Sequence, residues 1–194
     1  CSTKSQSTGT ANPTQAARGS RFCFLQQVRS RQTAPVSDAT LSAPRVLTAR
    51  NADFLVFAAN GFLIATWMSR VPDVKQMLGL TPGQLGLMLL AASAGAVIGL
   101  PLSGRIAHGH GAAFTARVGG FIATPGLVFS AVAAQFQHSM WLVMPGLFMV
   151  GLGSGIWDVA QNLEGTFIER AIGKAIMPWF HAAFSGGTVV GALI

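Results

Sequence analysis

A few polar side chains stand inside otherwise apolar stretches of this sequence, and they are the residues that could do chemistry. Asp158 and Asn162 are four residues apart and fall on one helical stripe with Gly151 and Gly155. A carboxylate in such a stretch can exchange a proton or bind a polar solute when it faces a cavity. We therefore take Asp158 and Asn162 as candidates for a substrate or proton pathway.

Asp158 also has a purely structural interpretation. It stands near the end of its apolar stretch, where a carboxylate can reach water or pair with Arg105 or Arg170. The sequence leaves both interpretations open.

Two further polar positions join the candidate pathway. His181 shares a stripe with Ser185 and Thr188, and its imidazole could relay a proton because the unperturbed pKa of histidine is about 6.5. A hydrogen-bonded packing face is the alternative for this stripe. Asn60 lies on one helical face with Trp67, which we expect to anchor the outer end at the membrane interface rather than to bind substrate.

Signals for an enzyme or a metal centre are weak. The segment Gly151-Leu-Gly-Ser-Gly155 has the glycines of a phosphate-binding loop, but the lysine that such a loop requires does not follow it. His108 and His110 lie two apart on a glycine-rich turn without a third ligand nearby. We expect no enzymatic activity, no cofactor and no metal.

The composition decides which kind of element positions these residues. The 194 residues are 51% hydrophobic and only 10% charged, whereas about a quarter of the residues in a soluble domain are charged. Such a chain has too little polar surface to cover a globule in water, so its natural solvent is lipid.

Five apolar stretches succeed one another after residue 50. They cover residues 51–69, 84–104, 118–136 and 140–161, and a fifth stretch begins near residue 175. The complete stretches have about 19–22 residues, which is the length that about 30 Å of hydrocarbon requires of a helix. The predicted fold class is an all-α membrane protein with about five transmembrane helices, and we expect the sequence to be a fragment.

Local signals support helices. Thr81, a following proline and Gln84 predict a capping box at the start of the second helix. Residues 109–111 predict a tight turn, and Pro125 and Pro145 predict kinks inside the third and fourth helices. Glycines four residues apart predict close helix packing on three helices. These pairs are Gly95 and Gly99, Gly151 and Gly155, and Gly187 and Gly191.

Residues 1–50 differ in texture and carry seven Lys or Arg side chains against Asp38 alone. We predict a disordered, basic cytoplasmic leader beside an anionic membrane surface, followed by a partial N-terminal helix bundle over residues 51–194. A mitochondrial-type transit peptide is the alternative. Nucleic-acid binding is disfavoured, because Phe22 and Phe24 are the leader's only aromatic residues and no recognition fold is visible.

The basic residues also predict the orientation of the helices. One side of the predicted membrane carries eleven Lys or Arg side chains, and the other side carries only Arg70 and Lys75. The eleven are the leader's seven with Arg105, Arg117, Arg170 and Lys174. Because cytoplasmic loops are rich in Lys and Arg, this bias predicts a cytoplasmic N-terminus.

Three segments carry a resemblance to a known family. The first joins Asn60-Gly-Phe-Leu to Trp67-Met-Ser-Arg-Val-Pro72, and the second runs from Gln84-Leu-Gly-Leu-Met to Gly104-Arg-Ile-Ala-His-Gly-His-Gly111. The third is Asp158-Val-Ala-Gln-Asn162 with Ile176-Met-Pro-Trp-Phe-His181. Over residues 51–194 the chain resembles the first five helices of the major facilitator superfamily, in particular an uncharacterised bacterial branch near the fucose permeases.

The loop between the second and third helices departs from that family's pattern, Gly-x-Leu-Ala-Asp-Arg-x-Gly-Arg-Arg. Gly104 and Gly111 match it, whereas His108 stands at the acidic position and alanines replace the last two basic residues. The resemblance makes this loop, with Gly104, Arg105, His108 and Gly111, the candidate gate, but the substitutions put its charge pairing in doubt. The fourth helix also lacks the arginine-rich motif of the drug–proton antiporters.

The resemblance implies a secondary active transporter that works by alternating access around a central cavity, lined by the first and fourth helices with the fifth beside them. The family's complete fold has twelve helices. We expect a small polar solute, with a sugar ahead of a drug, coupling to protons, and an inner or plasma membrane location. Partners are then the solute, protons and lipid, without nucleic acid. The alternative is a non-transporting membrane sensor or scaffold subunit built from the same helices.

Overall fold

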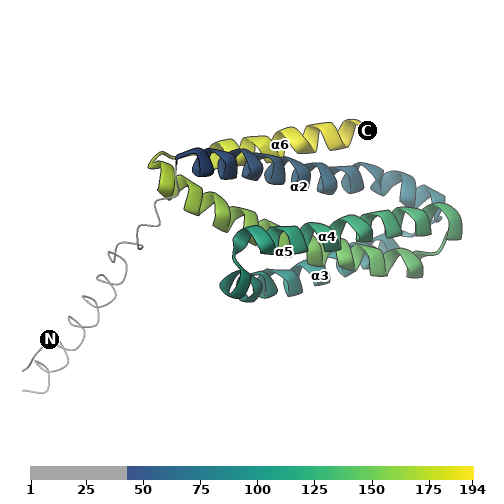
Figure 1. The fold of residues 1–194 in the computed structure, drawn as a ribbon. Coiled ribbons are helices and arrows are strands. Elements are labelled where there is room, and N and C mark those ends of the chain that lie inside the picture. Colours follow the sequence, from purple (N-terminus) through teal and green to yellow (C-terminus); the bar gives the residue numbers. More distant parts are fainter. Residues whose placement is uncertain (1–42) are drawn as a thin grey trace, which may run out of the picture. The chain divides into compact units, whose positions relative to one another are not determined.

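The computed structural model describes residues 43–194, and the regular elements among them are all helices (Figure 1). Four of these are long and apolar enough to cross a membrane, counting η1 as the end of α4, and α6 has 17 residues. The elements are α2 (Ala43–Met77), α3 (Pro82–His110), α4 (Ala112–Val132), the π-helical turn η1 (Ala133–Gln137), α5 (Met140–Ile172) and α6 (Met177–Leu193). The predicted all-α membrane fold is confirmed in the described part of the chain.

The first and fourth helices are longer than the predicted spans. α2 has 35 residues and α5 has 33, so each is about 50 Å long, against about 30 Å of hydrocarbon. Apolar stretches report only the part of a helix inside the hydrocarbon, whereas Arg, Lys, Glu and Gln continue a helix readily into water. Residues 43–50, assigned above to the leader, are therefore helical, and the prediction for residues 1–42 lies outside the described residues.

The start of α3 follows the sequence signals. The backbone N–H of Gln84 donates to Thr81 Oγ1 at 3.3 Å, and the N–H of Thr81 donates to Gln84 Oε1 at 2.9 Å, which confirms the capping box. The end of α3 is tighter than predicted, because the helix continues through His110. Gly111, with φ of 84°, alone separates α3 from α4, a conformation that glycine adopts without strain.

The connection between α5 and α6 is held by a carboxylate. Glu169 Oε2 accepts hydrogen bonds from the backbone N–H of Ile176 at 2.8 Å and of Met177 at 2.9 Å. These groups belong to the first turn of α6, where backbone donors lack helical partners and a negative charge is favourable. The end of α5 is thereby fixed to the start of α6.

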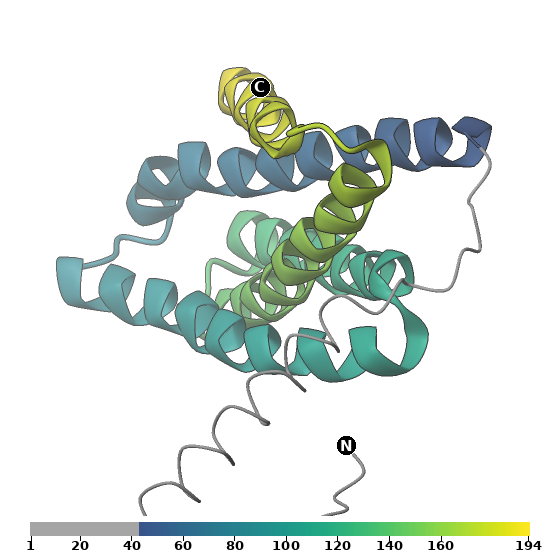
Figure 2. The ribbon, with the colours of Figure 1, turned by 90° about the vertical axis from the view of Figure 1, so that its left-hand side faces the viewer.

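The closest helix pairs include one sequence neighbour and two pairs that are distant in the sequence. α5 packs against α3 and α4, and α2 packs along α6 (Figures 1 and 2). A methyl group added at Gly151 would collide with the backbone of Ala92 on α3, and one added at Gly187 would collide with the backbone of Ala58 on α2. The predicted glycine faces are therefore packing faces, as expected where lipid provides no hydrophobic drive between helices.

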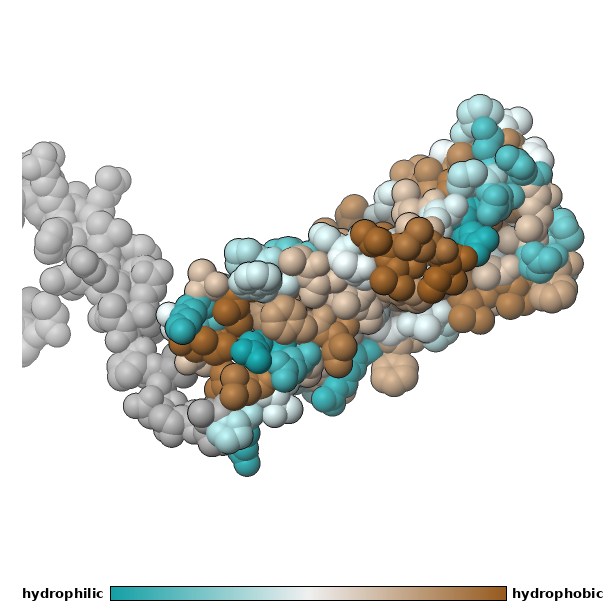
Figure 3. All heavy atoms as spheres, turned by 90° about the horizontal axis from the view of Figure 1, so that it is seen from above, coloured by the Kyte–Doolittle hydropathy of each residue, from teal (hydrophilic) through white to brown (hydrophobic). Residues whose placement is uncertain are grey.

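The prediction that Trp67 is an anchor at the membrane interface is wrong. It is only 7% exposed and packs in a core cluster with Val74, Met88 and Leu147, so it is not an interfacial anchor. The large apolar side chains that are exposed lie instead along the outer faces of the helices. Figure 3 shows hydrophilic side chains gathering toward the helix ends and apolar ones along the length between them. This distribution suits a bundle surrounded by lipid.

Candidate functional site

The structure extends the helix that carries Asp158. Because α5 continues to Ile172 rather than ending near Gln161, Asp158 stands two residues from the middle of the helix, about 3 Å along its axis. Asn60 stands at the middle of α2. Asp158 still lies near the end of the apolar stretch of residues 140–161, because α5 continues beyond that stretch.

Asp158 is exposed, and two amide side chains hold it. Gln161 Nε2 donates to Asp158 Oδ1 at 3.2 Å, while Asn162 Nδ2 donates to the backbone oxygen of Asp158 at 2.8 Å and to Oδ1 at 3.4 Å. The structure thus brings Asp158 and Asn162 together, as predicted, and adds Gln161. The one ion pair within residues 43–194 is Arg70–Asp73, at 3.7 Å on the surface, so the alternative pairing of Asp158 with an arginine is not found there.

An uncovered carboxylate within an apolar stretch constrains what lies beside it. A charged residue at the centre of a helix that faces lipid costs about 2.5–3.5 kcal/mol on insertion scales. Water in a cavity, or a second polar protein surface, removes that cost. The face of α5 that carries Asp158 is therefore suited to a polar cavity rather than to lipid.

Asn60 is fully buried, and neither Oδ1 nor Nδ2 has a hydrogen-bond partner. Val56 and Leu63, on the same stretch of α2, belong to the core cluster that includes Trp157 and Ala160 of α5. Leaving a buried amide unpaired costs about 1–3 kcal/mol. Asn60 is consequently a place where a bound water or polar ligand would be stabilised.

His181 lies at the start of α6 and is exposed. Its ring meets that of Phe57 edge-on, with centroids 5.5 Å apart. The hydroxyl of Ser185 donates to the backbone oxygen of His181, and that of Thr188 to the backbone oxygen of Ser185. The hydroxyls of this stripe therefore bind their own helix, which matches the packing interpretation for Ser185 and Thr188 and leaves the imidazole accessible.

The candidate gate is a helix end rather than a loop. Gly104, Arg105 and His108 lie in the last two turns of α3 and are exposed, and Gly111 is the single connecting residue. His110, predicted with His108 on a turn, is also helical, and its ring stacks on Phe114 with centroids 5.1 Å apart. Residues 104–110 include four glycines or histidines, a composition that predicted a loop. An α-helix can nevertheless contain these residues in its last turns.

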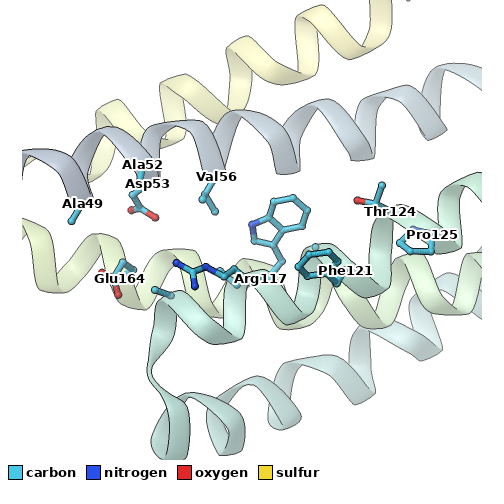
Figure 4. A pocket seen from close by; sticks show the side chains of 13 residues that line it. Ala49, Ala52, Asp53, Val56, Arg117, Phe121, Thr124, Pro125 and Glu164 are labelled. Atoms are coloured by element: carbon cyan, nitrogen blue, oxygen red, sulfur yellow. The ribbon is translucent and has the colours of Figure 1, made fainter.

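A pocket that the sequence did not indicate lies between α2, α4 and α5 (Figure 4). Its volume is about 720 Å³. Most of its lining is apolar, and Asp53, Arg117 and Glu164 are its charged side chains. The residues that line it are Ala49, Ala52, Asp53, Val56, Ala113, Ala116, Arg117, Gly120, Phe121, Thr124, Pro125, Trp157 and Glu164.

Asp53 is the most deeply buried charged group of the pocket. It is 4% exposed and its Oδ2 has no hydrogen-bond partner. Figure 4 shows Asp53 on α2, Glu164 on α5 and Arg117 on α4 gathered at one end of the pocket. A signal for Asp53 was present in the sequence, since it is an ionisable residue inside the predicted first span, and such residues mark functional sites by default.

α5 presents further unpaired polar atoms on the same stripe as Glu164. Trp157 Nε1 and Gln161 Oε1 are buried without partners, and the three residues are spaced by four and three. This spacing places them on one face of the helix. The side of α5 toward α2 and α4 is therefore more polar than its apolar sequence suggests.

Several curated proteins are similar to this chain. An uncharacterized transporter of Sinorhizobium fredii is 38% identical over 136 residues, which are 70% of this chain and 35% of the relative. An uncharacterized MFS-type transporter of Yersinia pestis is 31% identical over 138 residues, 71% of this chain and 35% of the relative. Membrane protein MosC of Rhizobium meliloti is 25% identical over 137 residues, 71% of this chain and 33% of the relative.

These similarities agree with the four apolar helices. The protein is a multi-pass α-helical membrane protein. The chain spans about a third of the length of the curated relatives it matches. No family model and no solved structure matches it.

Proposed function

We propose that the chain is the N-terminal part of a secondary transporter of the major facilitator superfamily, which moves a small polar solute by alternating access. The similarity to two proteins named as transporters, one of them MFS-type, supports the class. The observation that carries the proposal is the uncovered Asp158 group at the middle of α5, with its two amide neighbours.

Alternating access requires two bodies that enclose a polar site near the middle of the membrane. Asp158 provides a carboxylate near the middle of α5 on a face that the described helices leave uncovered, and the half-buried Asn162 provides an amide beside it. Asn60, at the middle of α2, supplies a further amide with no partner of its own. Carboxylate and amide groups suit a solute with several hydroxyls, so we propose a sugar ahead of a drug, in line with a branch near the fucose permeases.

The proposed coupling ion is a proton, because Asp158 and His181 provide a carboxylate and an imidazole, the side chains that form proton relays in membrane transporters. The proposed location is the inner or plasma membrane with a cytoplasmic N-terminus. The positions of Arg105, Arg117 and Arg170 support this orientation, since they lie at helix ends that share one side of the predicted topology.

Uptake by the full-length protein in proteoliposomes tests the proposal. A panel of sugars is offered with and without an imposed proton gradient, and one pH unit corresponds to about 1.4 kcal/mol per proton, or about tenfold accumulation of a cotransported solute. Asp73→Asn serves as the control variant for Asp158→Asn. Asp73 is an exposed acid that pairs with Arg70 at the other end of α2. Binding of a solute without gradient-driven accumulation or exchange would favour the sensor or scaffold alternative.

A further inference from the structure

The buried polar atoms that lack a hydrogen-bond partner gather on two helical stripes. Among residues 43–194 they belong to Asp53 and Asn60 of α2 and to Ser154, Trp157 and Gln161 of α5. The two on α2 are seven residues apart, and the three on α5 are spaced by three and four, so each set lies on one face of its helix. In this part of the chain, buried polar groups are therefore left unmatched on these two helices and not on α3, α4 or α6.

Asn60 lies level with Trp157 across the interface between α2 and α5. A methyl group added at Gly165 of α5 would lie 3.2 Å from Asp53 Oδ2, so these two positions are adjacent. The helices run in opposite directions, since the end of α5 lies at the same end of the bundle as the start of α2 (Figures 1 and 2). Asn60 is seven residues further along α2, and Trp157 is eight residues back along α5, which are steps of about 10 and 12 Å. Gln161 is one turn of α5 closer to Asp53.

The protein encloses these groups on both sides. Val56 and Leu63, which flank Asn60 on the same face of α2, belong to one core cluster with Trp157. Asn60 is 0% exposed and Gln161 is 1% exposed, so neither side chain reaches lipid or bulk solvent. Buried polar groups in proteins are nearly always hydrogen-bonded, to protein or to ordered water. The unmatched atoms of this interface consequently point to a small bound partner.

The unmatched atoms comprise as many donors as acceptors. Asn60 Oδ1 and Gln161 Oε1 are acceptors, while Asn60 Nδ2 and Trp157 Nε1 are donors. Gln161 Nε2 is already used, because it donates to Asp158 Oδ1 at 3.2 Å. A cation would satisfy only the two oxygens, and an anion would satisfy only the two N–H groups. A water molecule donates two hydrogen bonds and accepts two, so it matches the whole set.

We propose that an ordered water molecule is bound between Asn60 of α2 and Trp157 and Gln161 of α5 and joins the two helices. It donates to Asn60 Oδ1 and Gln161 Oε1, and it accepts from Asn60 Nδ2 and Trp157 Nε1. Asn60 is thereby connected to Asp158 through the water and Gln161. The pocket lined by Val56 and Trp157 reaches this interface and gives water a route to it. The site goes beyond the proposed transport function and does not depend on it.

The sign of one stability change tests this inference. Asn60→Leu replaces the amide by an apolar side chain of similar shape. In a dry interface this substitution removes two unpaired polar atoms from the core and should stabilise the full-length protein. At a water site it expels the water, leaves Trp157 Nε1 and Gln161 Oε1 unpaired, and should destabilise the protein. We expect a lower midpoint in denaturant titration in micelles, and a midpoint equal to or above that of wild type overturns the proposal.

A double-mutant cycle asks whether Asn60 and Gln161 share the water. Gln161→Met keeps the length of the side chain and removes its acceptor. Either single substitution should expel the water, so the combined variant should lose less stability than the sum of the two single losses. Strictly additive losses contradict a shared water. Asn51→Leu is the matched control, since Asn51 is an exposed amide on the same helix and its replacement should not couple to Gln161→Met.

Radiolytic footprinting of the wild-type protein detects the water without any variant. X-ray irradiation converts bound water to hydroxyl radicals that oxidise adjacent side chains, and peptide mass spectrometry locates the oxidation. Trp157 and Trp67 form a matched pair, because they are 9% and 7% exposed and Trp67 packs in an apolar cluster. We expect several-fold more oxidation of Trp157 than of Trp67. We also expect heavy oxygen from labelled solvent to enter the Trp157 product more slowly than the products of exposed residues. Equal protection of the two tryptophans, or exchange at Trp157 as fast as at exposed residues, overturns the proposal.

Discussion

Two adjacent glycines on α6 allow the glycine-face packing to be tested with one substitution. A methyl group at Gly187 would meet the backbone of Ala58, with the carbonyl carbon at 2.8 Å and Cα at 3.0 Å, whereas a methyl group at Gly186 would meet nothing within 4 Å. Ordinary contacts of this kind begin at 3.4 Å. The carbonyl oxygen of Ala58 would be closer still, so Gly187→Ala requires α6 to retreat from α2 by about 1 Å or more, and a gap of about 1 Å forfeits about half of the attraction between the facing atoms.

We expect Gly187→Ala to lower the free energy of unfolding by about 1–3 kcal/mol, as overpacking does. Gly186→Ala should raise it by up to about 1 kcal/mol, because alanine favours a helix more than glycine does. Denaturant titration of the full-length protein in micelles, followed by tryptophan fluorescence, measures both. Equal effects of the two substitutions, or a stabilising Gly187→Ala, would refute the assignment of α6 to the face of α2.

The other predictions concern coupling, orientation and capping. Asp158→Asn keeps the shape of the side chain but removes its negative charge, so a solute that binds the carboxylate should bind the full-length variant more weakly. Isothermal titration measures this affinity, and an unchanged affinity would exclude Asp158 from the solute site. His181→Gln removes the imidazole and should therefore change the pH dependence of uptake. Uptake like that of wild type across about pH 5.5–8 would contradict the hypothesis that His181 relays a proton. Reporter fusions after Leu78 should be external and those after His110 cytoplasmic, and the reverse pattern contradicts the orientation. Thr81→Ala should lower stability by about 1 kcal/mol through loss of the N-cap, and a neutral effect in denaturant titration would show that the cap contributes little.

The sequence was sufficient for the helices because lipid imposes a simple rule on them. Each apolar stretch must satisfy its own backbone, and only a helix does so within one segment. The capping box at Thr81 and the glycine face at Gly187 rest on equally local rules, and both are present. The ends of α2 and α5 were missed because helix geometry continues beyond the apolar stretch.

The candidate site was less predictable because it depends on which helix faces which. Asp53, Arg117 and Glu164 are far apart in the sequence and meet only when α2, α4 and α5 are assembled. Trp67 illustrates the same difficulty, since its place near the end of an apolar stretch suggested the interface while its neighbours on other helices bury it. Asp53 could have been singled out as an acid inside a span, but its unpaired oxygen could not.

The pairing of α2 with α6 has a consequence for the synthesis of the protein. About one hundred residues separate the end of α2 at Met77 from the start of α6 at Met177, and at about 5–20 residues per second the ribosome needs about 5–20 s to make them. During that interval α2 has already left the ribosome, but the glycine face of α6 that packs against it has not yet been made. The interval between the synthesis of α3 and that of α5 is shorter, so the α3–α5 pair can form before the α2–α6 pair. The emergence of α6 is then the step at which the face of α2 with Ala58 and Phe62 becomes covered, and a ribosome stalled before Met177 would leave that face exposed to lipid.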